Sequence, residues 1–395
     1  MYEARITSIS LVICQCWQQL KRKKMKQIVI LVYLLTITSL QSCSAQVDKK
    51  SQAEELKLDS LINTLITNKG IPSIAIGIVK DNKVILAKGF GYANVEDKIF
   101  ADENTIYQLG SVTKMFTGHM LAGLINNQKI SISDTLANFF PDSMSFPKSP
   151  TGQVVTIKEI ATHSSEFPRY PANIQRTDPE PFKGYSVEEM LKGIEMVTID
   201  TIIGVRYNYS NFGYGVLGTA MENRMGKSLN MLMDENIFDS YNMSNTSLVY
   251  KEDFNKTLAI PYLEVSPYKR TEPWDMGMLS GAGNVFSNIA DLNKFMIELL
   301  QDTLINKIQQ TKYFQINDSW NYGLGCFIVD SKKRNTKIIY HGGDIDGYAS
   351  SLSLYPEYNL GFVILTNWGE GQVIGDAFTQ ITNEIENHFL GEITE

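Results

Sequence analysis

The alternation of apolar and polar residues predicts β-strands near both ends of the chain. Residues 74–80 and 83–87 are apolar runs on either side of Asp81-Asn82, a pair suited to a turn, so this segment is expected to form a hairpin. Three further strands are expected between Gly, Pro and Asn breaks in the C-terminal quarter, at 337–340, 350–355 and 360–365. Residues 372–390 then show helical periodicity.

The middle of the chain, about residues 106–300, is expected to be mainly helical, with long polar loops such as 168–185. Strands on both sides of a helical region predict an α/β (α+β) fold. In this fold one antiparallel sheet is built from N- and C-terminal segments, flanked by helices, and a helical subdomain is inserted between them. We expect residues 56–391 to form a single domain.

Charge is distributed unevenly along the 395 residues, 43% of which are hydrophobic. The first 42 residues carry six basic side chains and one acidic one, so the remainder has a net charge of −12 within a total of −7. Such an acidic body disfavours nucleic acid and anionic membrane surfaces as partners, because binding them requires a basic face.

The N-terminus has the features of an export signal. A basic stretch at 21–26 precedes an apolar stretch at 28–40, and Leu40-Gln41-Ser42-Cys43 resembles a bacterial lipobox, although Gln41 stands where a small residue is usual. We therefore expect residues 1–42 to be a signal region, with Met25 as an alternative start. Lipidation at Cys43 and a tether over 43–55 would then hold the protein in the cell envelope or periplasm. The alternative is ordinary cleavage after Ala45, which would remove Cys43.

Cysteine and histidine give little sign of redox or metal chemistry. Cys326 is the one cysteine that follows the signal and the lipobox, and the apolar run 324–329 predicts that it lies in a buried strand with an inert thiol. The four histidines show no spacing typical of a metal site, so no metal or other cofactor is expected.

Ser111-Val112-Thr113-Lys114 is the first group of residues that suggests chemistry. Residues three apart share one face of a helix, so the hydroxyl and the amine can touch. The residues that follow are apolar on nearly every side, which predicts a buried helix and a lowered pKa for Lys114. A partly neutral lysine can accept the proton of a neighbouring serine.

The Ser-x-x-Lys pattern is weak evidence by itself, since it recurs at Ser145–Lys148 and Ser266–Lys269. Both of these contain proline and are expected in loops. On the first motif alone, a helix N-cap with an exposed Lys114 remains an equal alternative.

Two further motifs carry polar groups suited to acyl transfer. Tyr209-Ser210-Asn211 supplies a phenol, which beside an ammonium could be held partly as phenolate, and an amide that could orient a substrate carbonyl. His341-Gly342-Gly343 ends an apolar run, and a glycine strand allows a substrate backbone to lie alongside as an added strand. The alternatives are a packed tyrosine and a strand-end turn with a solvated His341.

The order of these three motifs resembles that of the class C β-lactamase and D-alanyl-D-alanine carboxypeptidase family of penicillin-recognising serine hydrolases, which includes esterases and D-amino-acid peptidases. The resemblance covers about residues 58–390. It extends to several further segments, namely 88–94, 162–168, 281–287, 290–292, 347–348 and 365–367.

The resemblance implies a role for each motif residue. Ser111 would be the nucleophile, Lys114 its base and Tyr209 the general acid and base. Asn211 and the His341-Gly342-Gly343 wall would bind substrate, and the backbone N–H groups of Ser111 and Asp344 would form an oxyanion hole.

Three departures from the family pattern bear on the substrate. His341 and Gly342 stand where the β-lactamases usually have Lys and Thr, and a neutral imidazole is a poor anchor for a carboxylate. Glu166 replaces a glycine often found at positive φ, so this loop is expected to take a different course. The Asp344 carboxylate would repel an anion. These features favour a neutral or cationic ester or amide.

The sequence therefore predicts an exported serine hydrolase that cleaves an ester, amide or peptide bond of a small substrate, without a cofactor. One alternative is a penicillin-interactive D,D-carboxypeptidase or class C-like β-lactamase. Another is an inactive binding protein of the same fold.

Overall fold

The computed structural model describes residues 57–175, 180–369 and 371–392. The chain divides into two compact units, residues 1–60 and 61–395, and every labelled strand and helix belongs to the second unit. The expected signal region, the lipidation site Cys43 and the tether at 43–55 lie outside the described residues. The domain limits at 56 and 391 stay a prediction.

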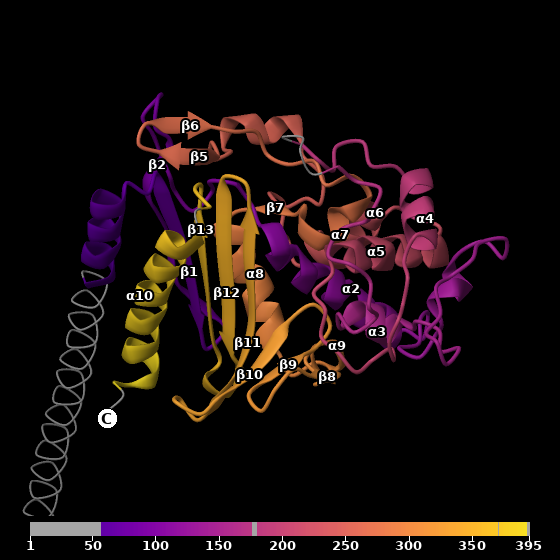
Figure 1. Ribbon diagram of the computed structural model, residues 1–395. Coiled ribbons are helices and arrows are strands. Elements are labelled where there is room, and N and C mark those ends of the chain that lie inside the picture. Colours follow the sequence, from indigo (N-terminus) through magenta and orange to yellow (C-terminus); the bar gives the residue numbers. More distant parts are fainter. Residues whose placement is uncertain (1–56, 176–179, 370, 393–395) are drawn as a thin grey trace, which may run out of the picture. The chain divides into compact units, whose positions relative to one another are not determined.

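A nine-stranded antiparallel sheet dominates the described part of the second unit (Figure 1). Its strand order is β3-β2-β1-β13-β12-β11-β10-β9-β8, so the first strand of the chain pairs with the last one. The strands are β1 (Ser73–Lys80), β2 (Lys83–Asn94), β3 (Ile99–Phe100), β8 (Phe314–Gln315), β9 (Trp320–Tyr322), β10 (Phe327–Ser331), β11 (Thr336–Ile345), β12 (Tyr348–Tyr355) and β13 (Leu360–Thr366). The predicted assembly of one sheet from both ends of the chain is confirmed.

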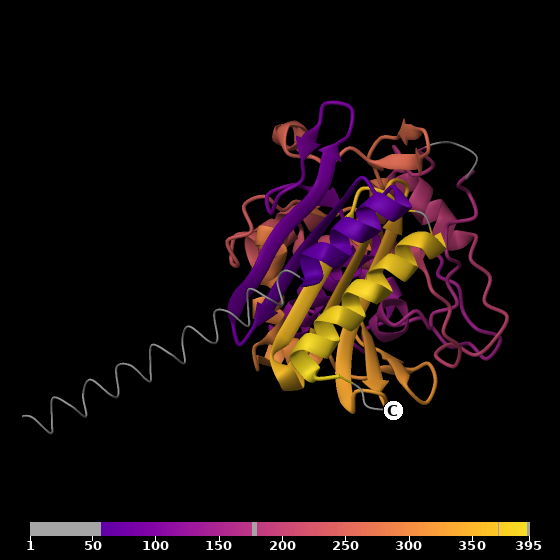
Figure 2. The same ribbon diagram turned by 90° about the vertical axis from the view of Figure 1, so that its left-hand side faces the viewer.

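Helices cover both faces of this sheet (Figure 2). On one face lie the helical residues 61–69 and α10 (Gly371–Leu390), whose buried positions Ile374, Ala377, Ile381 and Ile385 follow the helical spacing of three or four. The other face is covered by α8 (Ile289–Leu300), which packs on β1, β2 and β13. The helix predicted over 372–390 is thus confirmed to within one residue.

The region between β3 and α8 holds helices and long loops, as predicted, and also short strands that the sequence pattern did not reveal. Its helices are α2 (Thr113–Asn126), α3 (Ile157–Ala161), α4 (Val187–Glu195), α5 (Asn211–Met225), α6 (Leu229–Met233) and α7 (Ser280–Gly283). The strands form two small sheets, β4 (Tyr107–Gln108) with β7 (Phe286–Ser287) and β5 (Tyr262–Val265) with β6 (Tyr268–Arg270). The helix α9 (Leu304–Gln309) follows α8.

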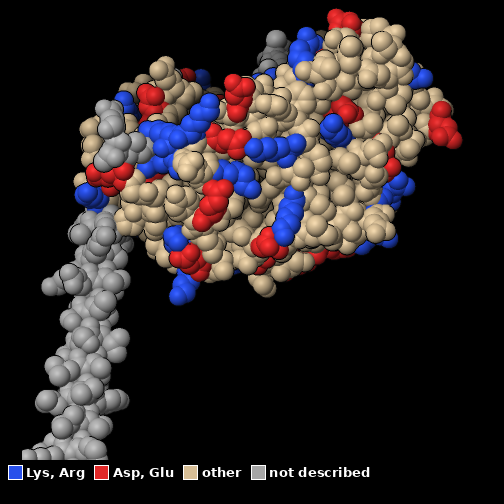
Figure 3. Space-filling model, turned by 90° about the horizontal axis from the view of Figure 1, so that it is seen from below, with Lys and Arg blue, Asp and Glu red and all other residues tan. Residues whose placement is uncertain are grey.

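Two properties of the molecule concern its surroundings. None of the helices in the described part of the chain combines the length and apolar character that a membrane span needs. On the face shown in Figure 3, lysine and arginine side chains are interspersed with aspartate and glutamate. This face therefore carries no continuous basic stripe.

The sequence pattern placed Cys326 in a strand, and this was wrong. Residues 324–326 form a bend, and β10 begins only at Phe327. Here the chain passes against α2 so closely that a Cβ added at Gly325 would lie 1.8 Å from the Lys114 carbonyl oxygen. Cys326 is nevertheless fully buried, and burial raises the pKa of its thiol to about 12, in keeping with the expected inert cysteine.

The contact between α2 and this bend predicts opposite effects for two glycines of the same helix. A Cβ added at Gly118 would lie 1.9 Å from the Leu324 carbonyl oxygen, whereas one added at Gly123 would have no atom within 4 Å. We expect Gly118→Ala to lower the free energy of unfolding by about 1–3 kcal/mol through overpacking. Gly123→Ala should raise it by up to ~1 kcal/mol through helix propensity. Urea unfolding of both variants tests this, and equal stability of the two would contradict it.

Candidate active site

Ser111 lies in a short 3₁₀ turn, Gly110–Val112, that leads directly into α2. The turn is fastened to the sheet, because Ser350 Oγ of β12 donates a hydrogen bond of 2.6 Å to the Leu109 carbonyl. Gly110 adopts φ 51°, a left-handed conformation suited to glycine. Ser111 therefore precedes the α-helix and does not lie within it, yet it still faces Lys114 in the first helical turn.

The amine of Lys114 is completely buried and has three oxygen neighbours. Nζ lies 2.7 Å from Asn211 Oδ1, 2.7 Å from the Ala282 carbonyl oxygen and 3.2 Å from Ser111 Oγ. The described residues form no ion pair with it. Burial lowers the pKa of Lys114 well below its usual value, and the positive charge of Arg169 lowers it further.

These neighbours determine what a neutral Lys114 can do. A neutral amine has two N–H donors and one lone pair. Asn211 Oδ1 and the Ala282 carbonyl can only accept, so they take both N–H groups. The lone pair is thereby left for the third neighbour, the Ser111 hydroxyl.

Tyr209 approaches the same hydroxyl from another side. Its O–H donates to Ser111 Oγ at 2.9 Å, and its ring lies 4.8 Å from Lys114 Nζ. Burial raises the pKa of Tyr209, and this effect exceeds the opposing influences of the Ser111 hydrogen bond and the Arg169 charge. The expectation of a partial phenolate was therefore wrong for the resting site, because desolvation keeps the phenol protonated.

Asn211 is the first residue of α5, whose N-cap is Ser210. Its backbone N–H donates to the Arg169 carbonyl at 3.0 Å, which fixes the start of this helix beside the cleft. Since the side-chain oxygen accepts from Lys114, the amide NH₂ is the part of Asn211 left for a substrate carbonyl.

The two backbone amides predicted to form an oxyanion hole lie close together. A Cβ added at Gly343 would lie 3.0 Å from the Ser111 nitrogen, and one added at Gly110 would lie 3.0 Å from the Asp344 nitrogen. A two-residue turn, Asp346-Gly347, joins β11 to β12, so the pair next to the turn, Ile345 and Tyr348, is hydrogen-bonded. Hydrogen-bonded and non-hydrogen-bonded pairs alternate along antiparallel strands, so the next pair, Asp344 and Ala349, is not hydrogen-bonded. The Asp344 N–H consequently points away from β12, toward the Ser111 turn.

His341 is 2% exposed, so the alternative of a solvated ring was wrong. Burial lowers its pKa to about 3, with a further contribution from the charge of Lys114, and the ring is neutral as expected. The pairing of β10 with β11 ends at Tyr340, so the Gly342 N–H has no strand partner among the described residues and is left for a substrate lying alongside.

Sequence reasoning missed several residues that line this cleft, a cavity of about 420 Å³. The most consequential is Arg169, whose guanidinium carbon lies 5.4 Å from the centre of the Tyr209 ring. Phe327, Tyr340, Ile374 and Phe378 add apolar wall. No local pattern marks these residues, since they come from a loop, two strands and α10, and only the tertiary fold brings them together.

Glu166 adopts a left-handed conformation with φ 64°, which is uncommon for a residue with a side chain. Its carboxylate forms an ion pair with Arg206. The expectation that this loop takes a different course from that of the family stays a prediction.

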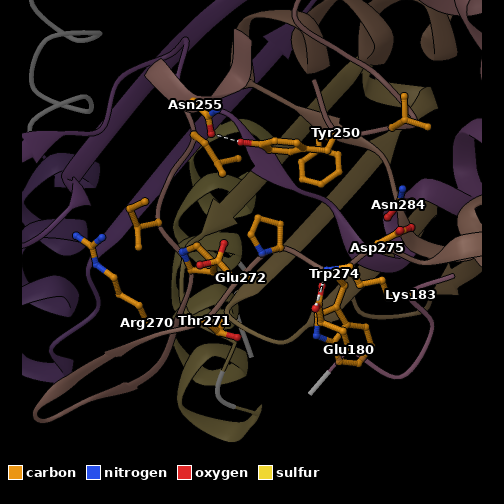
Figure 4. A pocket seen from close by; sticks show the side chains of 16 residues that line it. Glu180, Lys183, Tyr250, Asn255, Arg270, Thr271, Glu272, Trp274, Asp275 and Asn284 are labelled. Carbon is orange, nitrogen blue, oxygen red and sulfur yellow. Dashed lines mark hydrogen bonds and ion pairs between the residues drawn. The ribbon is translucent and has the colours of Figure 1, made fainter. Parts of the chain in front are cut away.

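The described residues also enclose a larger cavity of about 670 Å³ (Figure 4), which shares no lining residue with the cleft. Carboxylates of Glu180, Glu272 and Asp275 and aromatic rings of Tyr250 and Trp274 line it. It holds no residue of the three motifs, so the chemistry of the motifs belongs to the smaller cleft. No described group of three His, Cys, Asp or Glu residues could hold a metal ion.

Comparison with curated proteins gives distant relatives over most of the chain. Protein flp of Staphylococcus aureus strain MRSA252 is 24% identical over 346 residues, which cover 84% of this chain and 66% of that protein. Beta-lactamase-like protein 4 of Dictyostelium discoideum is 25% identical over 364 residues, covering 82% of this chain and 62% of that protein. The match thus spans just under two thirds of the length of these relatives.

Solved structures share the fold. The octameric penicillin-binding protein homologue from Pyrococcus abyssi superposes with a TM-score of 0.70 at 24% identity, over 82% of this chain and 77% of that one. The beta-lactamase/D-alanine carboxypeptidase from Yersinia pestis, complexed with citrate, gives a TM-score of 0.73 at 20% identity, over 83% and 98% of the two chains.

The family model described as Beta-lactamase matches residues 58–381, which include the three motifs. Its members are typically serine hydrolases, and both structural matches have the β-lactamase/transpeptidase-like fold. This chain belongs to the Beta-lactamase family.

Proposed function

We propose that the protein is a serine hydrolase that forms an acyl-enzyme on Ser111 and cleaves an ester or amide bond. The observation that carries this proposal is the environment of Lys114. Its amine is buried without an ion-pair partner among the described residues, and two carbonyl-type oxygens occupy its N–H groups. The lone pair is left 3.2 Å from the Ser111 hydroxyl, which suits a general base.

In acylation, Lys114 accepts the Ser111 proton while Oγ attacks the substrate carbonyl carbon. The negative charge that develops on the carbonyl oxygen is stabilised by the N–H groups of Ser111 and Asp344, each of which contributes about 3 kcal/mol in sites of this kind. Tyr209 donates its proton to the leaving oxygen or nitrogen. Lys114 then passes the proton that it took from Ser111 to Tyr209, which becomes a neutral phenol again.

In deacylation, water attacks the acyl-enzyme on Ser111 and the same groups act in reverse. Tyr209 and Lys114 remove the proton from the water, and the same two amides stabilise the second oxyanion. The Ser111 oxygen leaves as the alcohol once a proton is returned to it. No group outside this site is required for the proton balance.

We propose that the substrate is neutral overall near the scissile bond. His341 supplies no charge, and Arg169 and Asp344 both line the cleft. Burial raises the pKa of Asp344, and the positive charge of Arg169 opposes this effect. Arg169 makes a strongly cationic substrate less suitable than the sequence suggested, while Asp344 disfavours an anion.

A penicillin-interactive carboxypeptidase or β-lactamase is the second candidate. Arg169 favours it, because its guanidinium could hold a substrate carboxylate. The names of the similar Yersinia pestis and Pyrococcus abyssi proteins point in the same direction. An inactive binding protein is less well supported, since no group of the proposed mechanism is missing.

We further propose that the enzyme acts in the cell envelope or periplasm, held there by lipid on Cys43. The basic and apolar stretches before the lipobox-like residues 40–43 support export. Mass spectrometry of the mature N-terminus would separate lipidated Cys43 from cleavage after Ala45.

Labelling with a fluorescent fluorophosphonate tests the nucleophile. We expect wild type to label and to hydrolyse p-nitrophenyl acetate, and Ser111→Ala to lose both properties because the attacking oxygen is absent. Ser266→Ala is the matched control, since Ser266 heads another Ser-x-x-Lys sequence but lies in the β5–β6 hairpin. Equal labelling of wild type and Ser111→Ala would refute the proposed function.

The pH dependence of kcat/KM tests the base. Only neutral Lys114 accepts a proton, so the rate should rise about tenfold per pH unit up to the pKa of Lys114 and then level off. Because that pKa is lowered, the plateau should begin well below the ordinary lysine value of 10.5. Because the pKa of Tyr209 is raised, its phenol stays protonated around pH 10, and kcat/KM should not decline there. Lys114→Met should lose roughly 10²–10⁴-fold in rate. A wild-type rate that still rises through pH 10 would contradict this assignment.

The charge of Asp344 provides a test of substrate preference. We expect Asp344→Asn to raise kcat/KM for the anionic substrate nitrocefin about fivefold, the effect of removing ~1 kcal/mol of repulsion. Hydrolysis of neutral p-nitrophenyl acetate should change little, because the backbone N–H of residue 344 is retained. Asp318→Asn, in an exposed turn outside the cleft, is the control. Rapid nitrocefin turnover by wild type would instead favour the β-lactamase candidate.

A further inference from the structure

Three buried rings that take no part in the proposed proton transfers are joined by hydrogen bonds beside the cleft. They are His163, which follows α3, Tyr322 of β9 and His341 of β11. The Tyr322 hydroxyl oxygen lies 3.1 Å from His163 Nε2 and 3.2 Å from His341 Nε2. All three side chains are almost completely inaccessible to solvent.

The two ends of this row fix the direction of every hydrogen bond in it. The Ser210 backbone N–H can only donate, so His163 Nδ1, at 3.0 Å, carries no proton and Nε2 carries it instead. The Gly342 carbonyl can only accept, so His341 Nδ1, at 2.6 Å, carries the proton and Nε2 accepts. Tyr322 must therefore accept from His163 and donate to His341.

Each end of the chain of hydrogen bonds holds a part of the cleft. The backbone on both sides of Tyr209 is bound to His163, because Asn208 N–H donates to its carbonyl at 2.6 Å and Ser210 N–H donates to its ring. The rings of His163 and Tyr209 are in contact, with centroids 4.4 Å apart and planes tilted by 36°. The other end is Gly342, in the strand that forms the wall of the cleft.

The surroundings keep both imidazoles neutral. The hydrogen-bond directions require this, because each ring must have one nitrogen that accepts. Burial lowers the pKa of His163 and of His341, and a proton on Lys114 would lower both further. Several titratable groups surround this cluster of rings. They are Lys114 of α2, Tyr207 and Tyr209 before α5, Tyr214 of α5 and Cys326 in the bend before β10. None of these is a carboxylate that would favour an imidazolium.

We propose that Tyr322 is a positioning residue for the hydrolase. The directed chain from Ser210 through His163, Tyr322 and His341 to Gly342 fixes the acid and base Tyr209 relative to the strand that binds substrate. It also locks His341 in the Nδ1–H tautomer. The proposal rests on the proposed function for its effect on turnover, but the tautomers and the protonation states can be measured without any substrate.

The same aromatic cluster offers a matched control. The Tyr207 ring lies 5.7 Å from that of Tyr322 and 5.6 Å from that of His163, but the Tyr207 hydroxyl is buried and has no hydrogen-bond partner among the described residues. Tyr322→Phe and Tyr207→Phe therefore remove the same atom from the same cluster. Only the first change breaks the chain.

The experiment combines histidine NMR with kinetics. The chain has four histidines, so selective ¹⁵N and ¹³C labelling gives few signals. In wild type we expect His163 with its proton on Nε2, His341 with its proton on Nδ1, and no titration of either around neutral pH. In Tyr322→Phe, His163 Nε2–H and His341 Nε2 should lose their shared hydrogen-bond partner, so their ¹⁵N signals should shift while burial keeps the His341 ring neutral. The kcat should then fall ~10–100-fold because Tyr209 is less well positioned. Tyr207→Phe should resemble wild type in every measurement.

Opposite tautomers in wild type would overturn the proposal even if Tyr322→Phe does not fold. A Tyr322→Phe variant whose histidine ¹⁵N signals and kcat match those of Tyr207→Phe would overturn it as well, since Tyr322 would then only fill space. Failure of wild type to label at Ser111 would refute the proposed function instead. In that case the NMR measurements still decide whether the hydrogen-bond chain exists.

Discussion

The burial of the Lys114 amine is the constraint on which the site depends. Moving an ammonium group into a protein interior is costly, and the described residues provide no carboxylate to offset the cost. The structure instead provides two oxygens that accept from a neutral amine, Asn211 Oδ1 and the Ala282 carbonyl. The neutral amine thus fits this position better than the charged form. This preference leaves a lone pair directed at Ser111.

Much of the surrounding fold serves to keep this amine away from water. The helix α2 is buried along most of its length, and glycines at 118 and 325 let the bend before β10 lie directly on it. On the other side, α5 and α7 supply the two accepting oxygens. The nucleophile turn is then fastened to β12 through Ser350, so the Ser111 and Asp344 amides keep a fixed spacing. A rigid core therefore holds both the base and the oxyanion hole.

The sequence revealed those features that depend on local spacing. Ser-x-x-Lys indicated the contact between Ser111 and Lys114, and the pattern of apolar residues indicated that the helix is buried, from which the lowered pKa of Lys114 follows. Strand pairing between the ends of the chain could also be predicted, because alternating runs need partners. The structure corrected the surroundings of single side chains, such as the protonated Tyr209 and the buried His341.

Features that depend on distant segments could not be found in this way. Arg169 follows a proline in a loop, and nothing nearby indicates that it stands over Tyr209. Tyr322 and His163 are 159 positions apart, and only the tertiary fold brings them into hydrogen-bond contact. The short pairs β4–β7 and β5–β6 likewise have too few residues to produce a periodic pattern. The reactive groups of the cleft can thus be predicted from the sequence, but the residues that surround them cannot.

The most direct test of this account is the protonation state of Lys114 itself. The ¹³Cε chemical shift of lysines, followed by NMR from acidic to alkaline pH, reports each amine separately, and Lys114→Met assigns the signal. The account predicts one lysine that titrates well below the ordinary value of 10.5 and is therefore neutral over much of the working range. If Lys114 titrates together with the exposed lysines, it is charged in the resting site. It could not then act as the base for Ser111.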